Sequence, residues 1–188
     1  MVSAPTPNLQ GVFNYYRDAE IRGAALLMRI LQRIDDPEAQ VKLTKQIEEE
    51  MHHAWLWTKR ITDLGGMPSR VDDGYQRRLG KALGLPRTFE QLFALTVVVE
   101  ERAFKRYEAH AAVPDVDEET LTVLHEVTKD EKWHIAWIVK KLHDMAGDAK
   151  AAELLAHYRE IDERVFTEME AMERETLGFS VASTTEAS

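Results

Sequence analysis

Two Glu-x-x-His units are the residues of this sequence best suited to hold metal ions. They are Glu50 with His53 and Glu131 with His134. Residues three apart on a helix lie on one face, so both side chains of a unit can bind the same ion. A single unit arises often by chance. Here, however, both units interrupt apolar helical faces, where an ionisable side chain needs a partner. The pattern therefore predicts a metal site with two similar halves.

One lone glutamate stands a helix earlier than each unit, also at a core position. Glu20 interrupts the apolar face that includes Leu27, and Glu100 interrupts the face that includes Phe93. Four carboxylates turned toward one another in an apolar interior are very costly, and two divalent cations cancel their charge. We therefore predict a dimetal centre with six ligands: Glu20, Glu50, His53, Glu100, Glu131 and His134.

Carboxylate and imidazole ligands suit iron and manganese and argue against copper(I) or thiolate-type zinc sites. We expect two iron ions, with manganese or a mixed Mn/Fe pair as the alternative. In the expected scheme one terminal glutamate and one histidine hold each ion, Glu20 or Glu100 with His53 or His134. Glu50 and Glu131 bridge the two ions.

Acidic residues flank both units and are candidates for a supporting layer. Glu49 precedes Glu50, and Asp130 precedes Glu131. Each could accept the free ring N–H of the histidine across the site, which would orient that ring. The alternative is that both are solvated surface acids.

Two neighbours compete with predicted ligands. The helical phase favours Glu100 over Glu101, which leaves Glu101 as a flanking residue or an auxiliary ligand. The same phase favours His53 over His52, which we expect to be a partly exposed histidine. The remaining histidines, including His110, show no paired ligand spacing, so we assign them no role.

Two tyrosines are candidates for a catalytic role. Tyr16 lies one helical turn before Glu20, and Tyr107 lies two turns after Glu100. Either could donate a hydrogen bond to the site or be oxidised by it. The alternative is a core tyrosine whose hydroxyl has another partner.

The segments that must position these residues are all predicted to be helices. Capping residues and apolar spacing predict five of them, at about 9–34, 37–64, 89–113, 118–145 and 148–177. The segment 65–87 is too long for a tight turn and predicts a crossover joining parallel second and third helices. We expect an all-α four-helix bundle over residues 9–146, an additional C-terminal helix over 147–178, and disordered ends at 1–8 and 179–188.

Two surface features leave alternatives open. The fifth predicted helix carries its own apolar stripe, which must dock on the bundle or pair in a homodimer, and we favour the homodimer. The crossover is basic, and we expect a solvated face there, with an anionic substrate or carrier as the alternative occupant. Its cations are Arg70, Arg77, Arg78, Lys81 and Arg87.

The ligand segments resemble the ferritin-like di-iron carboxylate superfamily. The resemblance covers about residues 9–145 and is carried by YYRDAE at 15–20, IEEEMHHA at 47–54, VVEERAFKRY at 98–107 and KDEKWH at 129–134. The stretch around Glu50 is similar to rubrerythrins. The arginines after Glu100 and the His52–His53 doublet are similar to the tRNA-hydroxylase branch. The resemblance implies a ferritin-like bundle with O2 or peroxide chemistry at a di-iron centre.

The function expected from this resemblance is an oxidoreductase that needs an electron donor and, in an oxygenase, a small-molecule substrate. Oxidase, oxygenase and peroxidase subtypes stay open. The alternatives are a ferroxidase that stores or buffers iron and a non-catalytic helical module. The absence of cysteine removes a rubredoxin-type domain, and the long last helix is unlike that of storage ferritins.

The amino-acid composition excludes several other kinds of chemistry and binding partner. With no cysteine, the chain has no disulfides, iron–sulfur clusters or thiolate catalysis. A net charge of −9 disfavours general binding of nucleic acid. No apolar run approaches the length of a membrane span, and no basic, apolar leader opens the sequence. We therefore expect a cytoplasmic protein without membrane partners.

Overall fold

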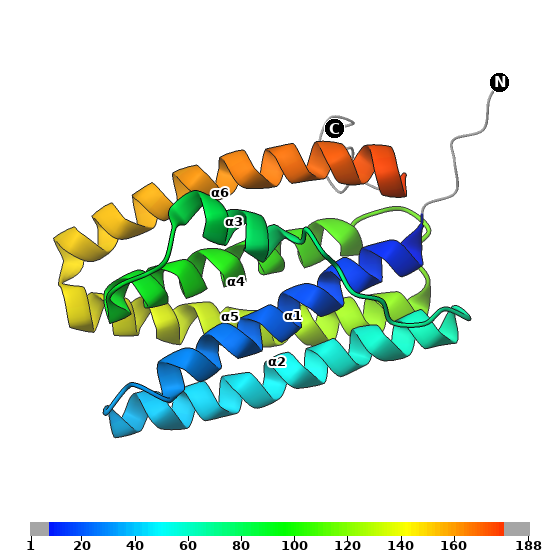
Figure 1. Ribbon diagram of the computed structural model, residues 1–188. Helices are drawn as coiled ribbons and strands as arrows, with labels where there is room; N and C mark the ends of the chain where they lie inside the picture. The colour runs from blue at the N-terminus through cyan, green and yellow to red at the C-terminus, as the bar shows by residue number, and fades with distance from the viewer. Residues whose placement is uncertain (1–7, 179–188) are drawn as a thin grey trace.

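The computed structural model describes residues 8–178, and these form six helices with no strand (Figure 1). The helices are α1 (Leu9–Leu31), α2 (Pro37–Asp63), α3 (Tyr75–Leu83), α4 (Phe89–Ala111), α5 (Glu118–Ala146) and α6 (Asp148–Leu177). The all-α bundle expected from the sequence is confirmed. The termini predicted to be disordered lie outside the described residues, apart from Asn8, which caps α1.

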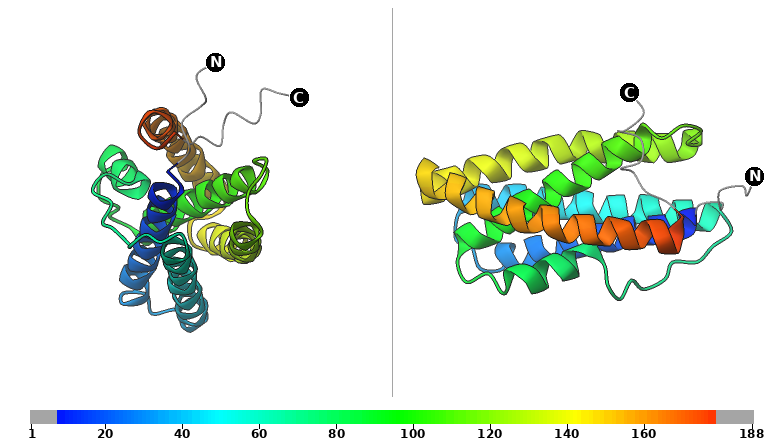
Figure 2. Two further views of the ribbon diagram at one scale, coloured as in Figure 1. Left: turned by 90° about the vertical axis from the view of Figure 1, so that its right-hand side faces the viewer. Right: turned by 90° about the horizontal axis from the view of Figure 1, so that it is seen from above.

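Four long helices, α1, α2, α4 and α5, form the bundle, as the end-on view of Figure 2 shows. α1 packs along α2 and α4 packs along α5, while α2 also meets α5 and α1 meets α4. The crossover after α2 returns along the length of the bundle, so α2 and α4 run parallel (Figure 1). This is the topology expected for a bundle with one long connection.

Helix boundaries follow the capping residues. Asp36 accepts a hydrogen bond from the Ala39 amide at 3.0 Å, and Pro37 occupies the first turn of α2. Asp117 caps α5 in the same way through the Thr120 amide. The first helix ends three residues earlier than predicted, yet Ile34 beyond it is still buried. The caps therefore set where each ligand-bearing helix begins.

The crossover contains a helix, α3, in addition to the five that were predicted. Gly74 and Gly84 bound it instead of interrupting it, and Gly84 has a φ of 76°, which favours glycine. Tyr75 and Leu79, four residues apart, are buried against the bundle. The predicted crossover is present, but its helix was missed because glycines at both ends concealed a nine-residue amphipathic segment.

The apolar interior consists of two clusters separated along the bundle axis. One cluster is built around Leu27, Leu43, Phe93 and Leu142, and the other around Phe13, Trp57, Tyr107 and Leu124. Each long helix contributes to the first cluster from one half of its length and to the second from the other half. The middle of the bundle, where the predicted ligands lie, is thus enclosed by apolar side chains on both sides.

α6 lies along the outside of the bundle and packs on α4, α3 and α5 of the same chain (Figures 1 and 2). The apolar stripe expected to need a partner is therefore covered within the chain, where Ala151, Tyr158, Val165 and Met169 are buried. Pairing of α6 in a homodimer is thus not required, and the homodimer stays a prediction. None of the helices between residues 8 and 178 has the length and apolarity of a bilayer crossing.

Buried ion pairs join α6 to α4. Arg102 binds Asp162 at 2.6 Å and Glu163 at 2.6 Å, and Arg106 binds Glu173. Asp162 also accepts a hydrogen bond from the Tyr75 hydroxyl at 2.6 Å, which ties α3 to the same point. The two arginines and their partners Asp162 and Glu173 are buried, so these pairs act in a medium of low polarity.

We expect Asp162→Ala to destabilise the protein by about 3–5 kcal/mol, because it leaves the buried Arg102 without its main counter-charge. Glu163→Ala is the matched control, since its side chain binds the same guanidinium but is 69% exposed; its cost should be about 0–1 kcal/mol. Urea denaturation of both variants measures the difference. Equal costs for the two would contradict the role given to the Asp162 pair.

Candidate metal centre

The six predicted ligands converge at the middle of the bundle, one glutamate from each of the four long helices. Glu20 comes from α1, Glu50 and His53 from α2, Glu100 from α4, and Glu131 and His134 from α5. None of the six side chains is more than 3% exposed. Gly23 leaves room for this arrangement, because a Cβ at that position would lie 2.9 Å from Glu50 Oε2.

Two overlapping groups of ligand atoms can each hold an ion. Glu50, Glu100, Glu131 and His134 form one group, and Glu20, His53 and Glu131 form the other; within each, the ligand atoms lie within 4.8 Å of one another. Glu131 belongs to both groups and is placed to bridge them. Glu50 lies in the first group only, so its bridging role stays a prediction.

Both histidines direct Nδ1 into the site. His53 Nδ1 lies 3.8 Å from Glu20 and 4.0 Å from Glu131, and His134 Nδ1 lies 3.3 Å from Glu50 and 3.4 Å from Glu131. These separations between histidine nitrogen and carboxylate oxygen place each ring beside a different pair of carboxylates. Each half of the site therefore offers nitrogen and oxygen donors together.

Several buried atoms of the site have no hydrogen-bond partner within residues 8–178. They are His53 Nδ1, His134 Nδ1 and both carboxylate oxygens of Glu131. Buried polar atoms are almost always paired, and an unpaired group costs free energy. A cation bound among these lone pairs would satisfy all four atoms at once. The residues present therefore fit a bound metal pair.

The electrostatics of the carboxylate side chains point the same way. Burial, with repulsion from Glu100 and Glu20, raises the pKa of Glu50 well above its usual range. Burial and the charge of Glu131 raise the pKa of Glu100, and burial and the charge of Glu50 raise that of Glu131. Without a cation these side chains favour the protonated form.

Comparison with known families adds an independent observation. A family model described as the ferritin-like domain matches residues 30–147, more than half of the chain. This chain belongs to the ferritin-like family. No curated protein and no solved structure matches it. Glu20 precedes the matched segment, so its place in this ferritin-like site rests on geometry. The rubrerythrin-like or tRNA-hydroxylase-like branch stays a prediction.

Two acidic side chains contact the two histidines at Nε2, the ring nitrogen that points away from the site. His53 Nε2 lies 3.3 Å from Asp130 Oδ2, and His134 Nε2 lies 3.0 Å from Glu49 Oε2. Each acid thus pairs with the histidine of the opposite helix, which is the geometry expected from the sequence. An N–H at Nε2 that bonds to the acid leaves the Nδ1 lone pair free for a metal.

Gln46 belongs to the site but was missed by the sequence analysis. Its Nε2 donates to Glu100 Oε1 at 2.7 Å and to Glu50 Oε1 at 3.3 Å, and its Oε1 accepts from Trp137 Nε1 at 2.9 Å. It is fully buried. Its position one turn before Glu50 on α2 was the available signal, since that turn faces the same core.

Of the two candidate tyrosines, only Tyr107 contacts a predicted ligand. Its hydroxyl donates to Glu20 Oε1. Burial, and then the charge of Glu20, raises the pKa of Tyr107 well above its usual range, so its hydroxyl keeps its proton. A direct role for this hydroxyl in the reaction stays a prediction.

Tyr16 requires a correction, because its hydroxyl bonds to His110 and not to the site. Tyr16 Oη lies 2.9 Å from His110 Nδ1. Burial, followed by the charge of Arg106, lowers the pKa of His110 to about 4, so the ring is neutral where it bonds to the tyrosine hydroxyl. His110, to which the sequence analysis assigned no role, is therefore the buried partner of Tyr16.

The competing residues also lie outside the site. Glu101, considered as an auxiliary ligand, binds Arg159 of α6 with an Oε2–Nε distance of 2.8 Å. One residue of helical rotation turns it from the core toward α6, and it joins neither group of ligand atoms. His52 is exposed and pairs with Glu126 at 2.9 Å.

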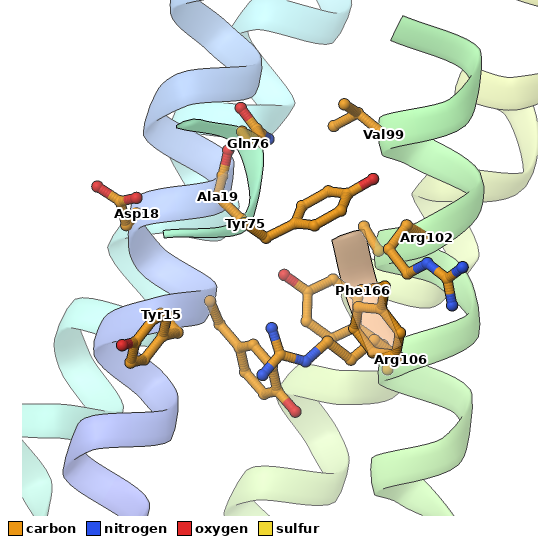
Figure 3. Close-up of a pocket in the computed structure, with 12 residues that line it drawn as sticks. Tyr15, Asp18, Ala19, Tyr75, Gln76, Val99, Arg102, Arg106 and Phe166 are labelled. Atoms are coloured by element: carbon orange, nitrogen blue, oxygen red, sulfur yellow. Dashed lines mark hydrogen bonds between the residues drawn. The ribbon is translucent and has the colours of Figure 1, made fainter. Parts of the chain in front are cut away.

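A small pocket lies beside Tyr107, between α1, α3, α4 and α6 (Figure 3). Its volume is about 30 Å³. Arg102 and Arg106 of α4 and Phe166 of α6 lie on one side, and Gln76 and Val99 lie together at one end (Figure 3). A space of this size holds about two waters, so it admits only very small molecules.

Glu131→Gln should stabilise the metal-free protein at pH 8. The raised pKa of Glu131 means that the folded state binds more protons than the unfolded state. The contribution of Glu131 to the free energy of unfolding therefore falls as the pH rises above the ordinary glutamate pKa of about 4.3. Removing the ionisable group should raise Tm by roughly 2–10 °C, for about 1–3 kcal/mol.

The measurement is thermal unfolding of chelator-treated protein between pH 5 and pH 8. Glu101→Gln is the matched control, because its carboxylate lies outside the site and pairs with Arg159. The increase in Tm of Glu131→Gln over the native protein should become larger as the pH rises. A gain that is the same at pH 5 and pH 8 would argue against buried repulsion as its cause.

Glu49→Gln should weaken metal binding about 10- to 100-fold, because His134 loses the carboxylate that orients its ring. Glu48→Gln is an adjacent control, since Glu48 is exposed on the same helix. Competition against a chelator of known affinity measures both. Equal affinities in the two variants would show that Glu49 is only a surface acid.

Proposed function

We propose that this ferritin-like protein is a di-iron, or mixed manganese–iron, carboxylate oxidoreductase that reacts with O2 or peroxide. The observation that carries the proposal is the pair of overlapping ligand groups joined at Glu131, with both histidine Nδ1 atoms turned inward. A donor set of carboxylate oxygens and imidazole nitrogens is suited to iron and manganese.

In this proposal Glu20 and His53 hold one ion and Glu100 and His134 hold the other. Glu131 serves both, and Glu50 completes the second group. When bound, a reduced iron pair supplies the electrons that reduce O2 or peroxide. Four carboxylates balance the four positive charges of two divalent ions, so the loaded interior carries little net charge.

The protein contributes by excluding water from the site, by orienting the ligands and by fixing where their protons lie. The apolar clusters on both sides of the site exclude water from it. Asp130 and Glu49 keep the histidine protons at Nε2, away from the ions. The Tyr107 hydroxyl keeps its proton and donates a hydrogen bond to Glu20 Oε1. These contacts set ligand geometry before any ion arrives, which lowers the cost of reorganisation.

The pocket beside Tyr107 supports a small oxidant as the species that reaches the centre. Its volume of about 30 Å³ suits molecules of the size of O2 or hydrogen peroxide. A small-molecule substrate, if the reaction uses one, needs a wider approach than this pocket. An electron donor is also required to reduce the metals between turnovers.

The test combines metal content with oxygen consumption. Protein purified from its native host should contain close to two metal ions per chain by elemental analysis. After anaerobic loading with ferrous iron it should consume O2 in an oxygen electrode. Glu131→Ala should lose most of the metal and the activity, whereas Glu101→Ala, which removes a carboxylate outside the site, should keep both.

Other outcomes distinguish the alternatives. Many iron atoms per chain would identify an iron-handling ferroxidase instead of an enzyme with a fixed centre. No retained metal would reduce the site to a buried acidic cluster in a helical module. Two metals per chain without any consumption of oxygen or peroxide would support the metal centre but contradict the proposed oxidoreductase activity.

A further inference from the structure

A groove over α1, α3 and the start of α4 has a charge opposite to that of the chain. Its volume is about 520 Å³, within the roughly 300–1,000 Å³ typical of small-molecule sites. No acidic residue is among those that line it, whereas the chain has a net charge of −9. Its five cations are Arg22, Arg29, Arg33, Arg77 and Lys81.

Most of these cations are free to bind a ligand. Arg22 is the exception, because it binds Asp18 at 2.6 Å. Arg33 lies over the Phe89 ring at 5.6 Å, and Arg77 donates only to a backbone carbonyl. In the part of the chain that the structure describes, no carboxylate forms an ion pair with Arg29, Arg33, Arg77 or Lys81.

The floor of the groove is apolar. Leu26 of α1 and Leu92, Leu95 and Val99 of α4 line it, and the α4 side chains are less than a tenth exposed. At the rim, Leu85 is 89% exposed beside the cations. A ligand that suits both features has an anionic head for the rim and a hydrocarbon chain for the floor.

We propose that this groove binds a single-chain amphiphilic carboxylate, such as a fatty acid. The carboxylate pairs with Arg29 of α1 and Lys81 of α3, which approach it from two helices, and the alkyl chain lies along Leu26 and Leu95. Nucleic acid has no alkyl chain for the floor. An anionic membrane is disfavoured because the apolar surface is recessed and the whole protein is negatively charged.

The groove also shares a wall with the pocket beside Tyr107. Gln76 and Val99 line both spaces and lie at one end of that pocket (Figure 3). Gln76 is held there by a hydrogen bond of 2.8 Å to the Ala19 carbonyl. A chain lying on the floor of the groove therefore reaches the wall that separates the groove from that pocket. The binding itself does not depend on the metals.

Isothermal titration calorimetry with laurate below its micelle concentration tests the proposal on the full chain. We expect saturable binding of one laurate per chain. Octanoate should bind more weakly, with up to about fourfold lost for each buried methylene group removed. Dodecyltrimethylammonium, which has the opposite charge, should not bind.

Two sets of exposed substitutions separate specific binding from general attraction. Arg29→Glu with Lys81→Glu should weaken laurate binding about tenfold or more, since charge-assisted contacts are lost. Lys105→Glu with Arg164→Glu changes the net charge equally, at exposed cations that do not line the groove, and should leave the affinity unchanged. Leu85→Asp should also weaken binding, because it places a negative charge at the rim.

Each other result would overturn the proposal. Equal losses in both charge-reversal variants would mean non-specific attraction. Equal affinity for laurate and octanoate would mean a simple anion site without a role for the floor. Binding to phosphatidylglycerol vesicles with no binding of free laurate would identify a membrane surface instead.

Discussion

The mutual repulsion of four buried carboxylates is the constraint on which this structure depends. Glu20, Glu50, Glu100 and Glu131 share an interior from which two apolar clusters exclude water. The low dielectric constant of this interior strengthens the repulsion between the carboxylates, and it also strengthens their attraction to a cation. The apolar clusters therefore serve the site as well as stability, because a wetter interior would bind an ion less tightly.

Hydrogen bonds around the carboxylates connect the four long helices to one another at the level of the site. Gln46 of α2 reaches Glu100 of α4, and Trp137 of α5 reaches Gln46. Tyr107 of α4 reaches Glu20 of α1. Apolar packing alone tolerates small shifts of one helix along another, whereas these directional contacts do not. The polar layer thus sets the register of the bundle.

The parts of the structure that follow helical periodicity could be predicted from the sequence. The core phase separated Glu100 from Glu101 and His53 from His52, because a ligand must share a face with its apolar neighbours. The phase also placed Asp130 and Glu49 beside the histidines across the site. The ferritin-like family match agrees with the predicted fold.

What escaped prediction depends on contacts between helices. Periodicity could not show that Tyr16 turns to His110, since both residues suit a core face and only their relative heights decide the contact. Gln46 looked like an ordinary polar residue until Glu100 and Trp137 were placed beside it. The partners of Arg102 on α6 are remote in sequence and follow no repeat.

One contact joins the segments on either side of the family match. The Asn8 amide donates to the Leu177 carbonyl at 2.8 Å, so α1 begins where α6 ends. A Cβ at Gly11 would also lie only 2.7 Å from the Leu177 side chain, so the two helices touch closely there. The last helix thus holds the start of the first in place, and shortening α6 would loosen α1, the helix that carries Glu20.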